Sequence, residues 1–169
     1  MKKLGHLNRD IARVLASMGH TDSIVIADCG LPIPPGVECI DLSLQLGTPD
    51  FFAVLDSVLS DFKTERAVFA SECLTANAPV AARASQFAAQ GVAVDYVTHE
   101  EFKQRCRNAH AIIRTGECSP YANVILHSGV IFFKDRVMHV SLRGISKSFG
   151  PVHVLQDVDF NILGGEIHA

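Results

Sequence analysis

Hydrophobic residues recur with two different spacings along this chain, and the two spacings alternate. Apolar side chains at positions 11, 14, 15 and 18 follow the period of an amphipathic helix, with Asn8 as its N-cap and Gly19 as its stop. Further helices are predicted from a Thr48 cap through Leu59, at 79–90 and at 99–106. Short apolar or alternating runs predict strands at 24–28, 39–44, 66–70, 92–97, 111–114 and 121–126. Strands that alternate with helices indicate a layered α/β domain.

A histidine and a carboxylate stand at the two ends of the first predicted strand. His20 lies in the turn before it, and Asp28 ends it, just before a turn rich in Gly and Pro. Ligands of open α/β sheets bind beyond the carboxyl ends of the strands, so a crevice is expected to begin at Asp28. His20 reaches that crevice only by folding back or by serving a neighbouring subunit. The alternative is that His20 is a polar turn residue and Asp28 caps the next turn.

Three more polar side chains are candidates for a site. Thr98 and Glu101 have the spacing of a capping box, which places His99 in the first turn of a helix. Tyr121 and Asn123 lie near the start of the last predicted strand and share a face if the segment is extended. They either donate hydrogen bonds to sugar or carbonyl oxygens or cap the preceding loop, and His99 is alternatively an exposed first-turn residue.

The composition narrows the class of protein. With 169 residues, of which 48% are hydrophobic and 20% charged, the chain suits one globular domain with a sizeable core and an appendage. A net charge of −3 without a basic run argues against nucleic acid or an anionic membrane as partner. No apolar run approaches the roughly 18 residues of a membrane helix, and the N-terminus lacks the apolar core of a signal peptide, so a cytoplasmic protein is expected.

Several common chemistries have no motif in this sequence. The five cysteines are odd in number and share no CxxC spacing, which favours reduced thiols over a disulfide framework or a zinc site. GxGxxG and GxxxxGK[ST] are absent, so no nucleotide cradle is predicted. GxSxG and HExxH are absent as well, which removes support for a serine hydrolase or a zinc protease.

Four segments carry a resemblance to a known family. Residues 18–22, 27–34, 97–103 and 114–123 occur in the order of the corresponding motifs of the D-ribose pyranases, and residues 1 to about 133 resemble that family. The resemblance implies an enzyme that interconverts the pyranose and furanose rings of D-ribose without a cofactor. It also implies a three-layer α/β/α fold with a central mixed sheet, and a homo-oligomer that is a decamer of two pentameric rings.

The resemblance also assigns roles to individual residues. His20 is expected to be the catalytic proton donor, and the expected sugar-binding residues are Asp28, His99, Tyr121, Ala122 and Asn123. Opening a hemiacetal ring needs one base and one acid, and histidine serves as either near neutral pH. The related L-fucose mutarotases share the Gly-His and Ala-Asp elements, but the loop at 116–123 is similar to the ribose enzymes.

The last 32 residues have a different character. From Met138 the sequence resembles the opening strands of the ATP-binding subunit of sugar-importing ABC transporters, with Phe149 at the position of the adenine-stacking aromatic. The glycine-rich phosphate loop and its lysine are absent, so no phosphate site is expected. We therefore predict a sugar domain at 1–133 and a β-type extension at 134–169, which is alternatively a native part of the sugar domain. The competing function is a non-catalytic accessory subunit that docks on a ribose importer through this extension.

Overall fold

The chain folds into two compact units, Met1–Val130 and Ile131–Ala169, in the computed structural model. The structure describes residues 5–131 and 140–162. The predicted boundary between residues 133 and 134 lies outside the described residues. Within the described part of the chain, no helix is long and apolar enough to cross a membrane.

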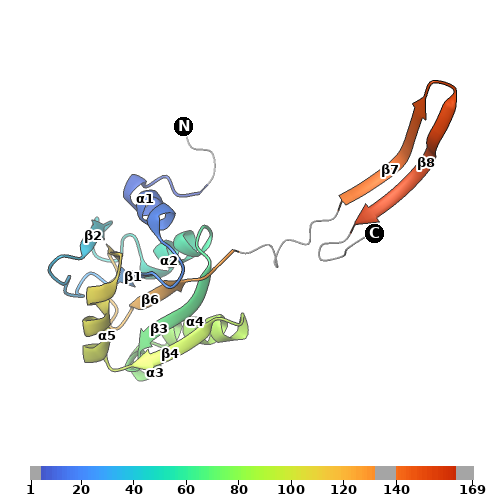
Figure 1. Cartoon of the computed structure of the whole chain (residues 1–169). Coiled ribbons are helices and arrows are strands. Elements are labelled where there is room, and N and C mark those ends of the chain that lie inside the picture. The colour runs from blue at the N-terminus through green and yellow to red at the C-terminus, as the bar shows by residue number, and fades with distance from the viewer. Residues whose placement is uncertain (1–4, 132–139, 163–169) are drawn as a thin grey trace. The chain divides into compact units, whose positions relative to one another are not determined.

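The first unit alternates strands and helices, as the spacing of apolar residues predicts (Figure 1). Its elements are α1 (Arg9–Ser17), β1 (Ser23–Ala27), β2 (Glu38–Asp41), α2 (Phe51–Leu59), β3 (Thr64–Ala70), α3 (Cys73–Ala76), α4 (Ala78–Ala89), β4 (Ala93–Val97), α5 (His99–Arg105), the 3-10 turn η1 (Cys106–Asn108), β5 (Ala111–Arg114) and β6 (Val124–Ser128).

These strands form one mixed sheet in the order β2-β5-β1-β6-β3-β4. β6 runs antiparallel to its neighbours β1 and β3, whereas the other adjacent strands are parallel. The carboxyl ends of β1, β2, β3, β4 and β5 therefore meet the amino end of β6 at one edge of the sheet, called here the carboxyl edge. The opposite edge, where β1 and β3 begin, is the amino edge.

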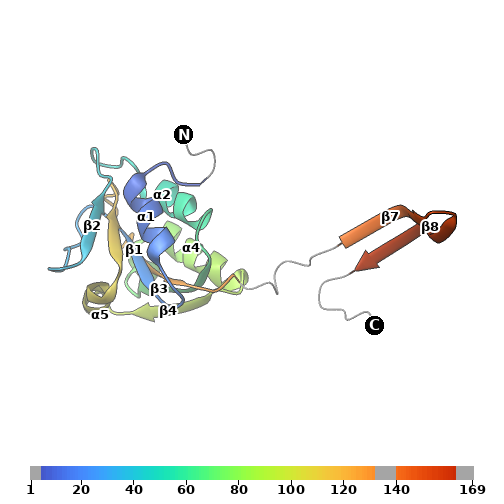
Figure 2. The ribbon, with the colours of Figure 1, turned by 45° about the horizontal axis from the view of Figure 1, so that its top comes forward.

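Helices cover both faces of this sheet, which confirms the predicted three layers (Figures 1 and 2). On β1, Ile24 and Ile26 pack in one cluster with side chains of α1, α2 and α4, while Val25 packs in a second cluster with Phe102 of α5. The largest fully buried side chains include Phe51, Phe69 and Phe102. Burying a side chain of this size contributes about 1.5–3 kcal/mol, so these two clusters hold the layers together.

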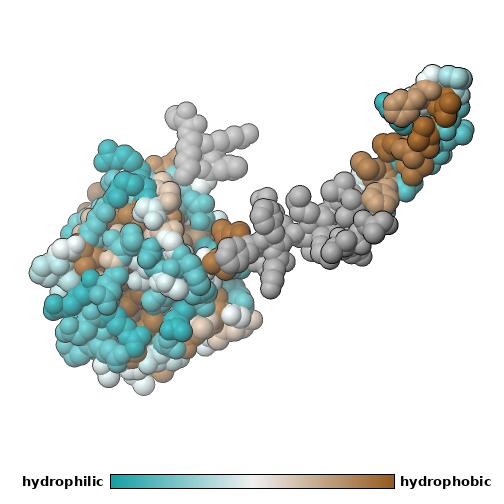
Figure 3. All heavy atoms as spheres, viewed as in Figure 1, coloured by the Kyte–Doolittle hydropathy of each residue, from teal (hydrophilic) through white to brown (hydrophobic). Residues whose placement is uncertain are grey.

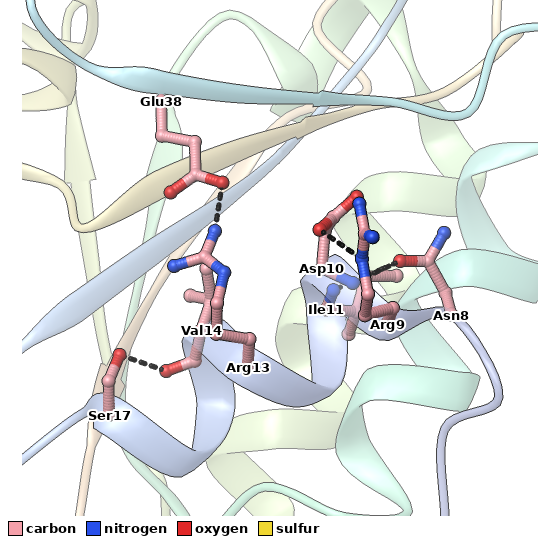
Figure 4. Close-up of polar contacts among 8 residues, drawn as sticks. All are labelled: Asn8, Arg9, Asp10, Ile11, Arg13, Val14, Ser17 and Glu38. Atoms are coloured by element: carbon pink, nitrogen blue, oxygen red, sulfur yellow. Dashed lines mark hydrogen bonds and ion pairs between the residues drawn. The ribbon is translucent and has the colours of Figure 1, made fainter.

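The first helix begins where the sequence predicts (Figure 4). The Asn8 side-chain oxygen accepts hydrogen bonds from the backbone N–H groups of Asp10 and Ile11 at 2.9 and 3.0 Å. Arg13 pairs with Glu38 at the start of β2. Such an exposed ion pair adds little stability, so the apolar face of α1 provides most of its anchorage to the sheet.

Two local predictions are wrong, and one short element has no prediction. Asp50, not Thr48, caps α2, because its carboxylate accepts from the Ala53 N–H at 2.9 Å while Thr48 pairs with Gln45 in an isolated bridge. The predicted strand at 121–126 begins only at Val124, because Tyr121 has a φ of 59° and leaves the extended conformation. The short helix α3 was not predicted, since four residues carry no helical period.

The second unit contains a β-hairpin of β7 (Val140–Phe149) and β8 (Val152–Ile162), which confirms the predicted β-type extension. Brown, hydrophobic side chains gather on this hairpin in Figure 3. A two-stranded hairpin has no second layer to cover such side chains. Those that stay exposed are Leu142, Ile145, Phe149, Val152, Val154, Leu155, Val158 and Phe160.

Candidate functional site

A pocket opens at the carboxyl edge of the sheet, where the sequence predicts a crevice. Its volume is about 330 Å³, at the lower end of the range for small-molecule sites. Side chains that carry oxygen, nitrogen or sulfur atoms line it from three segments: the loop after β1, the start of α5 and the loop before β6. The lining residues are Asp28, Cys29, Gly30, Leu31, His99, Glu117, Cys118, Ser119, Pro120 and Tyr121.

Asp28 is held in the pocket by a reciprocal pair with Asn123. The Asn123 amide donates to the Asp28 carboxylate at 2.6 Å, and the Asp28 backbone N–H donates to the Asn123 side-chain oxygen at 2.9 Å. The other carboxylate oxygen accepts from the Gly30 N–H at 2.9 Å. Asn123 is fully buried and does not line the pocket, so its contact with Asp28 fixes the orientation of that carboxylate.

His99 and Tyr121 form the second wall of the pocket. Their rings meet edge to face, with centroids 5.2 Å apart and planes at 82°. His99 also stacks on the buried Phe102, at 6.3 Å between centroids. The His99 Nδ1 atom is buried and has no hydrogen-bond partner among the described residues. Buried polar atoms are normally paired, so this unpaired nitrogen is an exception in the pocket wall.

Two polar side chains that sequence reasoning missed position this wall. Both oxygens of Glu72 accept from the His99 N–H, at 3.0 and 3.1 Å, and this hydrogen bond lowers the pKa of Glu72. The Asn77 amide donates to the Pro120 carbonyl at 2.8 Å, just before Tyr121. Neither residue belongs to a motif, and only the capping of α4 by Asn77 leaves a trace in the sequence, an Asn before Ala-Pro.

Glu117 organises the loop that precedes Tyr121. Its carboxylate accepts from the backbone N–H groups of Cys118, Ser119 and Phe51, the first residue of α2, at 3.0, 2.9 and 3.3 Å. Burial raises the pKa of Glu117, but the hydrogen bonds from Ser119, Phe51 and Cys118 outweigh it and leave the pKa below its usual value. The anionic form therefore stabilises the folded loop.

We expect Glu117→Gln to lower the free energy of unfolding at pH 7 by about 1–2 kcal/mol, because an amide cannot accept from all three N–H groups. A depressed folded-state pKa gives stability that is full above the unfolded value of about 4.3 and is lost as the pH falls through the folded value. The gap between the two proteins should therefore narrow below about pH 4. Urea unfolding at pH 7 and below about pH 4 measures the difference in the free energy of unfolding between the two proteins, with the exposed Glu100→Gln as control. A difference that does not change with pH would contradict the role of the charge of Glu117.

Gly116 joins the pocket loop to the turn at residues 44–48. Its carbonyl accepts from the Gly47 N–H at 2.6 Å, and its own N–H donates to the Pro49 carbonyl at 2.8 Å. A Cβ at this position would stand 2.3 Å from the Thr48 carbonyl oxygen and 2.5 Å from that of Gln45. Only glycine permits this approach of two backbones.

The remaining predicted site residues lie elsewhere. Ala122 is buried in the core, with 1% of its surface exposed. His20 precedes β1 and therefore stands at the amino edge, where its Nε2 atom is 3.0 Å from a Glu65 oxygen. The five residues of β1 alone span roughly 15 Å, so His20 does not reach the Asp28 pocket of its own chain.

The described residues offer no ready metal or disulfide site. No group of three His, Cys, Asp or Glu side chains among them is placed to hold a metal ion. All five cysteines are free, including Cys29 and Cys118 at the pocket. The pocket thus presents hydrogen-bonding groups around an aromatic wall, an arrangement suited to a small polyhydroxylated ligand.

Comparison with known proteins agrees with this geometry. The model of the RbsD / FucU transport protein family matches residues 1–131. Among curated proteins, the D-ribose pyranase of Chromobacterium violaceum is 72% identical over 132 residues, which are 78% of this chain and the whole of that protein. The D-ribose pyranase of Shouchella clausii is 57% identical over the same coverage.

Solved structures give the same result. Bacillus subtilis RbsD complexed with D-ribose is 44% identical, with a TM-score of 0.71 over 78% of this chain and all of that one. The fucose mutarotase of Streptococcus pneumoniae in complex with L-fucose is 27% identical, with a TM-score of 0.61 over 75% of this chain and 95% of that one. The chain belongs to the RbsD / FucU transport protein family.

Proposed function

We propose that this protein is a cofactor-independent D-ribose pyranase, an isomerase that interconverts the pyranose and furanose forms of D-ribose. The observation that carries the proposal is a hydrogen-bonding pocket at the carboxyl edge of a chain that is 72% identical to a curated D-ribose pyranase over the full length of that protein. The sugar presents several hydroxyl groups, and a binding site must pair each one that it buries.

The residues of the pocket suit the binding of a sugar. The Asp28 carboxylate accepts hydrogen bonds from hydroxyl groups, while the Tyr121 hydroxyl and a protonated ring nitrogen of His99 donate them. Asn123 orients Asp28 through its buried amide. Ala122 and Asn123 are buried behind the pocket, and in this proposal they bind the sugar only indirectly, by holding the loop that carries the left-handed Tyr121.

The reaction itself is a proton exchange. A base removes the proton of the anomeric hydroxyl, the bond between C1 and the ring oxygen breaks, and an acid protonates that oxygen. After rotation of the open chain, a different hydroxyl attacks the C1 carbonyl, loses its proton, and the carbonyl oxygen regains one. His20 is the proposed proton donor, because imidazole both gives and accepts a proton near neutral pH.

The position of His20 leads us to propose that each site is shared between subunits. His20 stands at the amino edge and the pocket at the carboxyl edge of the same sheet, so a second copy has to supply the histidine. Leu44 and Leu46 support this arrangement, because each is 79% exposed in a turn next to Cys29 of the pocket. The proposed assembly is a decamer of two pentameric rings. A cytoplasmic location is proposed as well, since the five free cysteines suit a reducing compartment.

The test is saturation-transfer NMR on D-ribose with catalytic amounts of the protein. Acceleration of exchange between ribopyranose and ribofuranose over the uncatalysed rate is expected. Exchange equal to that of ribose alone would favour the accessory-subunit hypothesis. Light scattering on the same sample tests the assembly, and a monomer that is active on ribose would contradict the shared site.

We expect a chain ending at Phe133 to fold and to keep the activity. The elements that build the pocket and every residue that lines it lie in the unit Met1–Val130, which has its own core. Thermal unfolding and the exchange assay on the shortened and full-length proteins measure this. Loss of folding on truncation would make the extension an integral part of the fold.

A further inference from the structure

The hydrogen-bonded pair of His20 and Glu65 is built by two separate features of the fold. The His20 Nε2 atom lies 3.0 Å from a carboxylate oxygen of Glu65. The two residues come from segments 45 positions apart in the sequence, and 51% and 41% of their side-chain surfaces stay exposed. The pair therefore lies at the amino edge within reach of a ligand, and it is far from the Asp28 pocket of the same chain.

The turn that carries His20 is held rigidly. The Gly19 N–H donates to the Asp22 carboxylate at 2.8 Å, and the Thr21 N–H donates to the Ser128 carbonyl of β6 at 3.0 Å. The Ser128 N–H in turn donates to the Asp22 carbonyl at 2.8 Å. Thr21 also has a φ of 71°, a left-handed conformation that is unusual for a β-branched residue. These contacts fix the backbone at His20, and the imidazole alone remains to be oriented.

Glu65 occupies an irregular position on β3. Thr64 pairs with Ser128 and Arg66 pairs with His127, so two consecutive partners on β6 face residues that are two apart on β3. Glu65 is thus the extra residue of a β-bulge. Bulges re-aim a side chain and occur often beside active sites. Gly129 leaves room for Glu65, because a Cβ at Gly129 would stand 3.1 Å from the Glu65 Cβ.

We propose that Glu65 is a positioning residue for His20. Its carboxylate accepts the Nε2 proton, which selects the tautomer of neutral imidazole with a bare Nδ1 atom and points that atom away from the pair. Nδ1 then takes the proton of the anomeric hydroxyl of the sugar bound to the neighbouring subunit and gives it to the ring oxygen as the C1–oxygen bond breaks, so that one nitrogen serves first as base and then as proton donor. This inference rests on the proposed function, in which His20 transfers the proton, and it adds the group that sets which nitrogen does so.

The kinetic test is Glu65→Ala in the full-length protein, with ribose exchange measured over a range of ribose concentrations. We expect kcat to fall roughly 10- to 100-fold with little change in KM, because the ring is misoriented while the sugar pocket is untouched. Glu65→Gln keeps an oxygen that accepts the Nε2 proton and should recover part of the loss. The matched control is Glu38→Ala, a carboxylate of similar exposure that pairs with Arg13 and should leave kcat unchanged.

A double variant separates positioning from a merely structural effect. If Glu65 acts through His20, adding Glu65→Ala to His20→Ala should not lower kcat further, since interacting residues are not additive. The proposal is overturned if Glu65→Ala lowers kcat by the same factor in the unchanged protein and in His20→Ala. It is also overturned if the kcat of Glu65→Ala is within twofold of that of the unchanged protein.

A spectroscopic test does not depend on activity. In protein labelled with ¹⁵N-histidine, the two ring nitrogens of His20 should report one dominant tautomer with the proton on Nε2. Glu65→Ala should shift both signals towards the averaged values of an imidazole without a carboxylate partner. If the ring signals do not move, Glu65 does not position His20. If the ring signals move as expected but the unchanged protein has no ribose exchange activity, the pair stands and the proposed function fails.

Discussion

His20→Ala is expected to slow the exchange of ribopyranose and ribofuranose by about 10²–10⁴-fold while the fold stays intact, because this is the range that one general acid–base group contributes. The side chain of His20 is half exposed and its contact with Glu65 is an exposed pair that adds little stability, so thermal unfolding should be nearly unchanged. His110→Ala is the matched control, since His110 is also a partly exposed histidine at the amino edge, next to Asp22. Its exchange rate should remain that of the unchanged protein.

Mixed assemblies test the shared site directly. His20→Ala lacks the proposed proton donor and Tyr121→Ala lacks part of the pocket wall, so each pure protein should be nearly inactive. If sites form between copies, dissociating and reassembling a mixture of the two proteins should create some sites with both His20 and Tyr121, and activity should return. Recovery that never exceeds the sum of the separate proteins would place both residues in the site of a single chain. Full activity of His20→Ala together with a loss in His99→Ala would transfer the proton-donor role to His99.

Gly116→Ala is expected to cost about 3 kcal/mol of folding free energy, the upper end for overpacking. The new Cβ would overlap the Thr48 and Gln45 carbonyl oxygens, and backbone atoms on both sides leave little room for a shift. For a domain of this size, the loss corresponds to a melting temperature lower by roughly 6–12 °C. Because the same residue joins the pocket loop to the 44–48 turn, ribose affinity should also weaken.

Gly19→Ala is the appropriate comparison for this variant. A Cβ there would meet its nearest atom, an Asp22 oxygen, at 3.7 Å, which is an ordinary contact. Differential scanning calorimetry of both variants should place Gly19→Ala within a degree or two of the unchanged protein. If Gly116→Ala has the same melting temperature as Gly19→Ala, the 44–48 turn moves freely away from the pocket loop.

The fold could be predicted from the sequence largely because its signals are local and periodic. Asn8 caps α1 and Thr98 caps α5 through hydrogen bonds that need only neighbouring residues. Where a distant contact decides, the prediction fails. Thr48 is of a residue type that often caps helices. Its backbone instead pairs with Gln45 and lies close to Gly116, so α2 starts after Asp50.

The candidate site likewise contains residues that could be predicted from the sequence and residues that could not. Asp28 and His99 follow predicted strands, and the topology brings those strand ends to one edge, so both could be predicted. Glu72 accepts a hydrogen bond from a backbone group of a distant segment, and Asn77 donates one to another. A sequence pattern does not indicate such partners. The pairing of His20 with Glu65 depends on a bulge in β3, which alternation of apolar residues does not reveal.

Because His20 and Asp28 lie at opposite edges of one sheet, the specific activity should depend on the protein concentration. In the proposed shared site, each chain supplies His20 at one end and the Asp28 pocket at the other, which is the geometry of a head-to-tail contact. Such contacts close into rings or continue as open filaments, whereas a two-fold dimer pairs identical patches. A closed ring has as many complete sites as subunits, but an opened ring of the same chains has one fewer. Specific activity should therefore decline with dilution before the individual subunits unfold.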